Sequence, residues 1–131
     1  MDKIRVVLAE DHPGVIAKIR RTLGEEFDVI KAVENGSQAI GAVLELDPDV
    51  FVTDISMPIL DGLQVARRIQ NSNSRTKIIF LTIHEDQDFL AAALSAGGAG
   101  YVTKCRLSTD LVPAIHEALN GHIFVSESMR M

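Results

Sequence analysis

Short hydrophobic runs alternate with amphipathic segments along nearly the whole chain. The runs are rich in Val, Ile, Leu and Phe and cover Ile4–Ala9, Phe27–Val33, Val50–Thr53, Lys77–Thr82 and Gly100–Thr103. Several of them contain almost no polar position, which is typical of strands that are covered on both faces by helices. The pattern therefore predicts five strands of a parallel sheet.

The segments between these runs carry apolar residues at helical spacing. Five such segments follow the strands in turn, around Val15–Leu23, Ala39–Leu46, Leu63–Ile69, Phe89–Leu94 and Leu111–Leu119. Regular alternation of strand and helix favours right-handed crossovers and a parallel sheet. The sequence therefore predicts an α/β fold, with five helices around a doubly wound sheet of five parallel strands.

Composition limits the class of protein. The chain has 131 residues, 47% of them hydrophobic, which suffices for one domain with an ordinary core. The single cysteine excludes an internal disulfide. The longest uncharged stretch, 89–103, is interrupted by glycines and is too short for a membrane helix. A net charge of −5 disfavours direct binding to nucleic acid. We expect a cytoplasmic protein without a secretion signal.

Polar residues follow the predicted strands at the points where the strands end. They are Glu10 and Asp11 after the first run, Asp54 after the third, Thr82 at the end of the fourth and Lys104 after the fifth. Ligands of open α/β sheets bind outside the carboxyl ends of the strands, so we expect these side chains to form one site. Each also has a plainer explanation: Glu10 and Asp11 as a solvated loop, Asp54 as a helix cap and Lys104 as an exposed lysine.

The residue types at these positions favour phosphoryl chemistry. Carboxylates that lie close together need a cation, and a set of oxygen ligands suits Mg²⁺. Asp54 follows a buried strand and can act as a nucleophile toward phosphorus, while Lys104 can hold a phosphoryl oxygen. The hydroxyl of Thr82 can donate to the same group, or it can cap the next helix, a role that Glu85 or Asp86 could also fill.

This set of residues resembles the response-regulator receiver domain of two-component signalling. The resemblance extends from Ile4 to about Asn120 and includes Asp54-Ile-Ser-Met-Pro58 followed by Asp61-Gly62. Further stretches resemble the NarL/LuxR-type subfamily; they are Glu10–Pro13, Leu81–Glu85, Ala96–Tyr101 and Gly121–Ser126. The resemblance implies a flavodoxin-like fold with the strand order 2-1-3-4-5.

The resemblance also implies a role for each site residue. Asp54 would be the phosphoacceptor, and Asp11, Asp54 and the backbone carbonyl of Ser56 would hold Mg²⁺, with Glu10 orienting a metal-bound water. Lys104 would pair with the phosphoryl group.

A switch pair follows from the same resemblance. Thr82 would move onto the phosphoryl group, and the ring of Tyr101 would occupy the space that it leaves. The surface formed by the fourth helix, fifth strand and fifth helix would then change. Without the resemblance, Tyr101 is explained equally well as an amphipathic aromatic residue at a sheet edge. His12 and His84 could face the site, but surface or capping roles explain them more simply.

The expected organisation is a receiver domain over residues 4–120, with residues 121–131 as a tail or the start of a linker. Whether this tail is ordered stays open at this stage. We expect an isolated receiver from a transcriptional regulator, phosphorylated by a sensor histidine kinase, forming a homodimer on activation and contacting DNA only through a C-terminal domain that this chain lacks. Its catalysis would be limited to its own phosphorylation and dephosphorylation.

Three alternatives share parts of this pattern. A phosphatase of the haloacid-dehalogenase type also uses an aspartyl nucleophile with Mg²⁺, but its second Asp would stand where this chain has Ser56. A flavodoxin-like cofactor binder would need a phosphate loop after the first strand, where Glu10 and Asp11 would repel a phosphate. A receiver that never takes phosphate is disfavoured by the complete set of acidic residues, Thr82 and Lys104.

Overall fold

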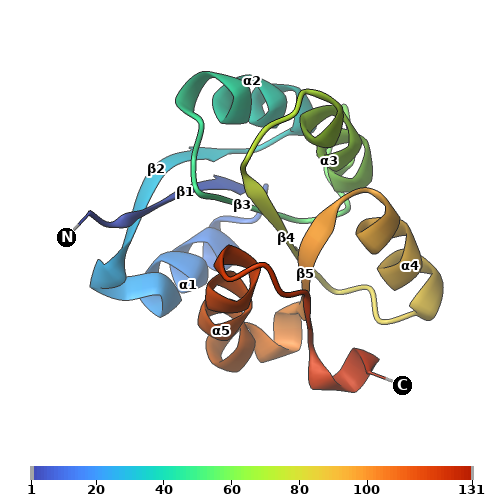
Figure 1. Cartoon of the computed structure of the whole chain (residues 1–131). Coiled ribbons are helices and arrows are strands. Elements are labelled where there is room, and N and C mark those ends of the chain that lie inside the picture. Colours follow the sequence, from blue (N-terminus) through green and yellow to red (C-terminus); the bar gives the residue numbers. More distant parts are fainter. Residues whose placement is uncertain (1, 131) are drawn as a thin grey trace.

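A computed structural model describes residues 2–130, which form a parallel sheet with helices on both faces (Figure 1). The strands are β1 (Ile4–Ala9), β2 (Phe27–Val33), β3 (Val50–Thr53), β4 (Lys77–Thr82), β5 (Gly98–Thr103) and β6 (Phe124–Val125). The α-helices are α1 (Pro13–Leu23), α2 (Gly36–Leu46), α3 (Gly62–Asn71), α4 (Gln87–Ser95) and α5 (Leu107–Leu119). No helix in the described range is long and apolar enough to span a membrane.

The strand order is β2-β1-β3-β4-β5-β6. The first five strands confirm the expected order, but the expectation of five strands is wrong by one. The additional strand β6 pairs in parallel with β5, with Phe124 opposite Gly100 and Val125 opposite Tyr101. A strand of two residues is too short to show an alternating pattern in the sequence. It can be recognised only in the structure, where it pairs with the outer edge of β5. Residues that follow α5 are therefore part of the sheet.

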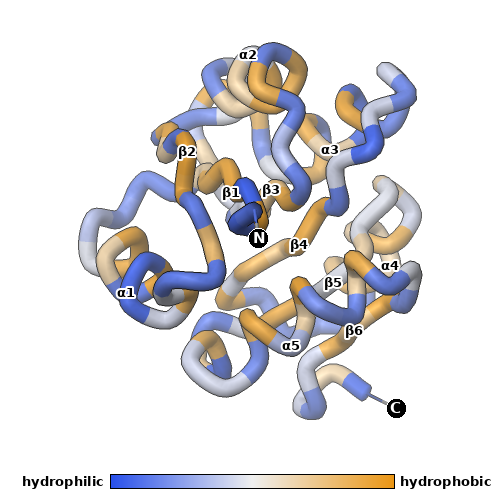
Figure 2. The backbone as a smooth tube through the Cα atoms, turned by 60° about the vertical axis from the view of Figure 1, so that its left-hand side comes forward, coloured by the Kyte–Doolittle hydropathy of each residue, from blue (hydrophilic) through white to orange (hydrophobic). Residues whose placement is uncertain are grey.

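The alternating side chains of the strands supply two hydrophobic clusters, one on each face of the sheet. From β1, Val7 and Ala9 join the cluster covered by α2, α3 and α4, whereas Val6 and Leu8 join the one covered by α1 and α5. Figure 2 shows the hydrophobic colour concentrated along the central strands and the hydrophilic colour along the connecting loops. The runs are continuously apolar because both of their faces are buried.

The loop after β3 is held close to the end of that strand. The backbone N–H of Gly62 donates to the carbonyl oxygen of Ile55 at 2.7 Å, and a Cβ atom at Gly62 would collide with the carbonyl oxygen of Asp54. Asp61 caps α3 through a reciprocal capping box with Gln64. The glycine and the cap together fix the segment that begins with Asp54.

The amino end of α4 has its own cap. The carboxylate of Asp86 accepts a hydrogen bond from the backbone N–H of Phe89 at 2.9 Å. The capping role that the sequence left open between Thr82, Glu85 and Asp86 therefore belongs to Asp86. The hydroxyl of Thr82 is left for other contacts at the end of β4.

Candidate functional site

The carboxyl ends of β1, β3, β4 and β5 meet at one edge of the sheet. Ala9 lies opposite Thr53, and Thr82 lies opposite Thr103 in the strand pairing. The polar residues predicted from the sequence lie at these strand ends. Glu10, Asp54 and Lys104 directly follow strands, and Thr82 is the last residue of β4. Glu10 and Asp54 are buried, with 2% and 7% of their surface exposed, and Thr82 is fully buried.

Lys104 joins the two buried carboxylates. Its Nζ atom lies 2.8 Å from Oε1 of Glu10 and 2.9 Å from Oδ2 of Asp54. Burial by itself lowers the pKa of Lys104, but hydrogen bonds and the charges of both carboxylates outweigh that effect and raise it above the usual 10.5. The ammonium stays charged, and it balances one of the two negative charges.

The remaining carboxylate oxygens have backbone partners. The N–H of His12 donates to Oε2 of Glu10 at 3.0 Å, and the N–H of Ser56 donates to Oδ1 of Asp54 at 3.3 Å. Asp11 differs from both, because its side chain is exposed and makes no hydrogen bond or ion pair within residues 2–130. Of the three acidic residues expected in the site, the structure brings Glu10 and Asp54 together through Lys104, and Asp11 follows Glu10 with an exposed side chain.

Three or more His, Cys, Asp or Glu side chains do not gather into a metal-binding group anywhere in the described part of the chain. Glu10, Asp54 and Lys104 nevertheless leave one formal negative charge in excess. The available donors are all oxygen atoms, which is the set that Mg²⁺ prefers. The charge and the donor chemistry thus fit a divalent cation, with Asp11 next to Glu10 as the additional carboxylate.

His84 lies over the loop that carries Asp54. Its Nε2 atom is 2.9 Å from the hydroxyl of Ser56, and its ring stacks on Phe89 with a centroid distance of 4.0 Å. The sequence allowed His84 to face the site but favoured a surface or capping role, and the structure shows the contact with the site. The only signal was its position two residues after Thr82, which does not reveal that the loop turns back toward Ser56.

Thr82 and Tyr101, the predicted switch pair, contact the backbone of the same residue. The hydroxyl of Thr82 accepts from the N–H of His84 at 3.2 Å, and the Tyr101 hydroxyl donates to the carbonyl oxygen of His84 at 2.8 Å. Tyr101 is fully buried. Tyr101 is therefore not exposed at a sheet edge, since β6 pairs beside it, and its role in a switch stays a prediction.

Burial dominates the titration of Tyr101. It raises the pKa to about 12, with smaller contributions from the negative charges of Asp86, Asp54 and Glu85. The chain has one tyrosine and no tryptophan, so the near-ultraviolet absorbance change of tyrosinate formation reports this residue alone.

We expect native Tyr101 to ionise near pH 12, whereas the urea-unfolded chain ionises near pH 10. Between these values the native state holds a proton that the unfolded state releases, so stability falls as pH rises. Absorbance titration of native and unfolded protein measures both values. Native ionisation near pH 10 would contradict the buried position.

A second group of acidic residues lies at the opposite end of the sheet. Arg75 pairs with Asp47 at 3.2 Å and with Asp49 at 2.9 Å, and the N–H of Arg5 donates to Asp49 at 2.8 Å. Burial raises the pKa of Asp49, but these bonds and the two arginine charges outweigh it and lower the pKa. The group is neutralised by arginine and ties together the amino ends of β1, β3 and β4.

Comparison with known proteins identifies relatives of the whole domain. The family model of the response regulator receiver domain matches residues 6–116. The chain is 33% identical to an uncharacterized transcriptional regulatory protein, YxjL, of Bacillus subtilis, and 32% identical to the response regulator GacA of Pseudomonas viridiflava. These matches cover 92% and 94% of the chain but only 56% and 58% of the relatives. The chain thus spans little more than half the length of the curated relatives it matches.

Solved structures show the same fold at similar identity. The isolated receiver domain of RcsB from Salmonella enterica, determined with the phosphomimetic BeF3⁻, matches with a TM-score of 0.88 and 32% identity, over 98% of this chain and 96% of that one. A LuxR-family response regulator from Aurantimonas matches with a TM-score of 0.91 and 29% identity, over 98% and 93%.

The receiver domain of NarL from Mycobacterium tuberculosis matches with a TM-score of 0.88 and 28% identity, over 93% of this chain and 100% of that one. Sequence and structure therefore lead to the same family, with relatives of the NarL/LuxR type. This chain belongs to the response regulator receiver domain family of two-component signalling.

Proposed function

We propose that Asp54 accepts a phosphoryl group from the phosphohistidine of a sensor histidine kinase, or from a small acyl phosphate. The observation that carries this proposal is the Lys104 ammonium between Glu10 and Asp54, at the carboxyl ends of the strands. It places a positive charge beside two buried carboxylates, where an isolated charge would be costly. A carboxylate oxygen held beside a fixed cation suits attack on phosphorus.

The transfer balances without a redox partner. An oxygen of Asp54 forms a bond to phosphorus while the bond from phosphorus to the donor's imidazole nitrogen breaks, and the electron pair leaves with the imidazole. The product is an acyl phosphate, which adds about one negative charge at Asp54. Lys104 is in place to pair with a phosphoryl oxygen, since its Nζ atom already contacts the acceptor carboxylate.

Asp11, Asp54 and the backbone carbonyl of Ser56 would hold Mg²⁺, with Glu10 orienting a bound water. Bound Mg²⁺ supplies positive charge to the phosphoryl oxygens as they pass through the transition state. The chain's own contribution is the placement of Glu10 and Asp54, which the backbone N–H groups of His12 and Ser56 fix in orientation.

Thr82 and Tyr101 would transmit the change in charge. In the proposed switch the Thr82 hydroxyl moves onto the phosphoryl group and the Tyr101 ring packs into the space it leaves. The hydroxyls of Thr82 and Tyr101 both hydrogen-bond to the backbone of His84. Movement of Thr82 therefore alters the segment around His84 that holds the Tyr101 hydroxyl. The output is association rather than turnover, with a homodimer as the activated form.

Contact with DNA would belong to the longer protein and not to this domain. Several relatives are transcriptional regulatory proteins that extend well beyond the matched region. The alternative of a haloacid-dehalogenase-type phosphatase has no support from these comparisons. Its second Asp is replaced by Ser56, whose hydroxyl is engaged with His84.

Incubation with acetyl phosphate and Mg²⁺ tests the proposal directly. We expect intact-mass measurement to show one phosphoryl adduct per chain, and chelation of Mg²⁺ with EDTA to suppress it by about 100-fold or more because transition-state charge is no longer balanced. Light scattering on the same samples is expected to show a shift toward dimer. A wild-type chain that gains no adduct, under conditions in which an established receiver does, would reject the function.

A further inference from the structure

The segment that follows α5 folds back over the face made by α4, β5 and α5. After β6 it continues through Ser126 into a single helical turn, Glu127–Met129. Ser126 is fully buried and Met129 is 1% exposed, within the hydrophobic cluster that contains Tyr101. Part of the face that was expected to respond to phosphorylation is therefore covered by the chain itself.

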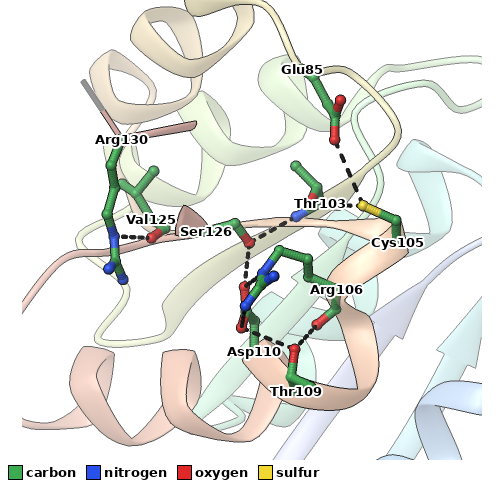
Figure 3. A network of polar contacts seen from close by, with 9 residues as sticks. All are labelled: Glu85, Thr103, Cys105, Arg106, Thr109, Asp110, Val125, Ser126 and Arg130. Atoms are coloured by element: carbon green, nitrogen blue, oxygen red, sulfur yellow. Dashed lines mark hydrogen bonds and ion pairs between the residues drawn. The ribbon is translucent and has the colours of Figure 1, made fainter. Parts of the chain in front are cut away.

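Ser126 links this segment to both β5 and α5. Its hydroxyl accepts from the N–H of Thr103 at 3.1 Å and donates to Oδ2 of Asp110 at 2.7 Å, as Figure 3 shows. Burial raises the pKa of Asp110, but hydrogen bonds from Arg106, Ser126 and Thr109 outweigh it and lower the pKa. Asp110 therefore stays charged, and it holds the serine firmly.

The remaining contacts anchor the end of the segment. The side-chain amide of Gln87, the first residue of α4, donates to the carbonyl oxygen of Met129 at 3.1 Å. The guanidinium of Arg130 donates to the carbonyl oxygen of Val125 at 2.8 Å and lies 5.5 Å from the ring centre of Phe124. We call residues 124–130 the docked tail.

Tyr101, His84 and Ser56, each hydrogen-bonded to the next, lie between the docked tail and Asp54. The N–H of Ser126 donates to the carbonyl oxygen of Tyr101 at 2.9 Å, and the hydroxyl of Tyr101 donates to the carbonyl oxygen of His84. From His84 the contacts continue through its ring to the hydroxyl of Ser56, whose N–H reaches Asp54. Every step is a direct contact, and such a network can carry energetic coupling between sites.

We propose that the docked tail is a built-in partner of the α4–β5–α5 face, holding Tyr101 buried and thereby stabilising the phosphoryl-bearing state of Asp54. The proposal rests on the proposed function of Asp54 and adds a regulator to it. Coupling is reciprocal, so a phosphoryl group at Asp54 must in turn tighten the tail.

Substitutions in the full chain test the coupling, with beryllium fluoride and Mg²⁺ as the phosphoryl mimic. Met129→Ala removes the buried side chain. Gln87→Ala removes the hydrogen bond from the Gln87 side chain to the carbonyl oxygen of Met129 and leaves the core unchanged. We expect calorimetric titration to show affinity for beryllium fluoride weakened about five-fold by Met129→Ala and less by Gln87→Ala. Ser128→Ala is the matched control, because Ser128 is exposed and its neighbour Met129 is buried.

Two further readouts separate the tail from the function of Asp54. Acrylamide quenching of tyrosine fluorescence, which reports Tyr101 alone, is expected to increase in Met129→Ala without any ligand. Hydrogen exchange at the amides of Ser126 and Met129 is expected to slow when beryllium fluoride binds. If the tail amides of Met129→Ala exchange faster but its affinity for beryllium fluoride stays at the wild-type value, the proposal is overturned. Acrylamide quenching of Tyr101 that is unchanged in Met129→Ala would also overturn it. Absence of binding to the wild-type chain would instead reject the function of Asp54.

Discussion

Asp54→Asn is expected to abolish phosphoryl transfer from acetyl phosphate, with a rate at least about 1000-fold below that of the wild-type chain. The carboxamide keeps the size of the side chain but removes the anionic oxygen that attacks phosphorus. The fold should persist, because Lys104 keeps its contact with Glu10 at 2.8 Å. Intact-mass measurement over time, followed by peptide fragmentation, gives the rate and the modified residue.

Asp28→Asn is the matched control for this substitution. Asp28 is an exposed residue on β2, at the edge of the sheet and outside the site. The control should acquire the adduct at the wild-type rate. Wild-type phosphorylation of Asp54→Asn would show that another residue is the acceptor.

Lys104→Met is expected to lower the free energy of unfolding by about 2–4 kcal/mol. The substitution keeps most of the apolar stem but leaves Glu10 and Asp54, 2% and 7% exposed, without the ammonium between them. Removing one partner of a buried ion pair leaves uncompensated charge, which costs more than the pair itself contributes. Urea unfolding in the presence of EDTA measures the loss without a compensating metal ion.

The double substitution Glu10→Gln with Lys104→Met distinguishes charge repulsion from lost packing. If repulsion between the two carboxylates causes the loss, the double variant should recover about 1 kcal/mol or more relative to Lys104→Met. Lys31→Met, at an exposed position of β2, should change stability by no more than about 0.5 kcal/mol. A loss in Lys104→Met that Glu10→Gln leaves unchanged would point to packing.

Several features of the site were predictable because they depend on short segments. Apolar runs placed the strands, and a parallel sheet brings all carboxyl ends to one edge. Glu10, Asp54 and Lys104 could therefore be grouped from their positions alone, and the structure shows them in direct contact. The roles of Asp54 as phosphoacceptor and of Asp11 as metal ligand stay predictions.

Other features could not be predicted, because they depend on how loops turn and on which side chains meet. His84 contacts Ser56 across 28 positions of sequence, and Tyr101 reaches the backbone of His84 across 17. The sequence permits surface roles for both residues. Their actual contacts follow from the path of the loop between β4 and α4, which carries no periodic pattern.

The sequence by itself determined the alternating layers and the identity of the acidic, hydroxyl and ammonium groups at the strand ends, whereas the order of the first five strands was only implied by the resemblance to receiver domains. The layers and the placement of these groups follow from local periodicity and from the geometry of parallel strands. Only the tertiary structure decided that β6 extends the sheet, that Met129 is buried beside the α4–β5–α5 face and that Ser126 joins β5 to α5. The physical reason is that a short segment has no conformation of its own, and its position is fixed by the edge of β5, the hydrophobic cluster that takes Met129 and the charged carboxylate of Asp110.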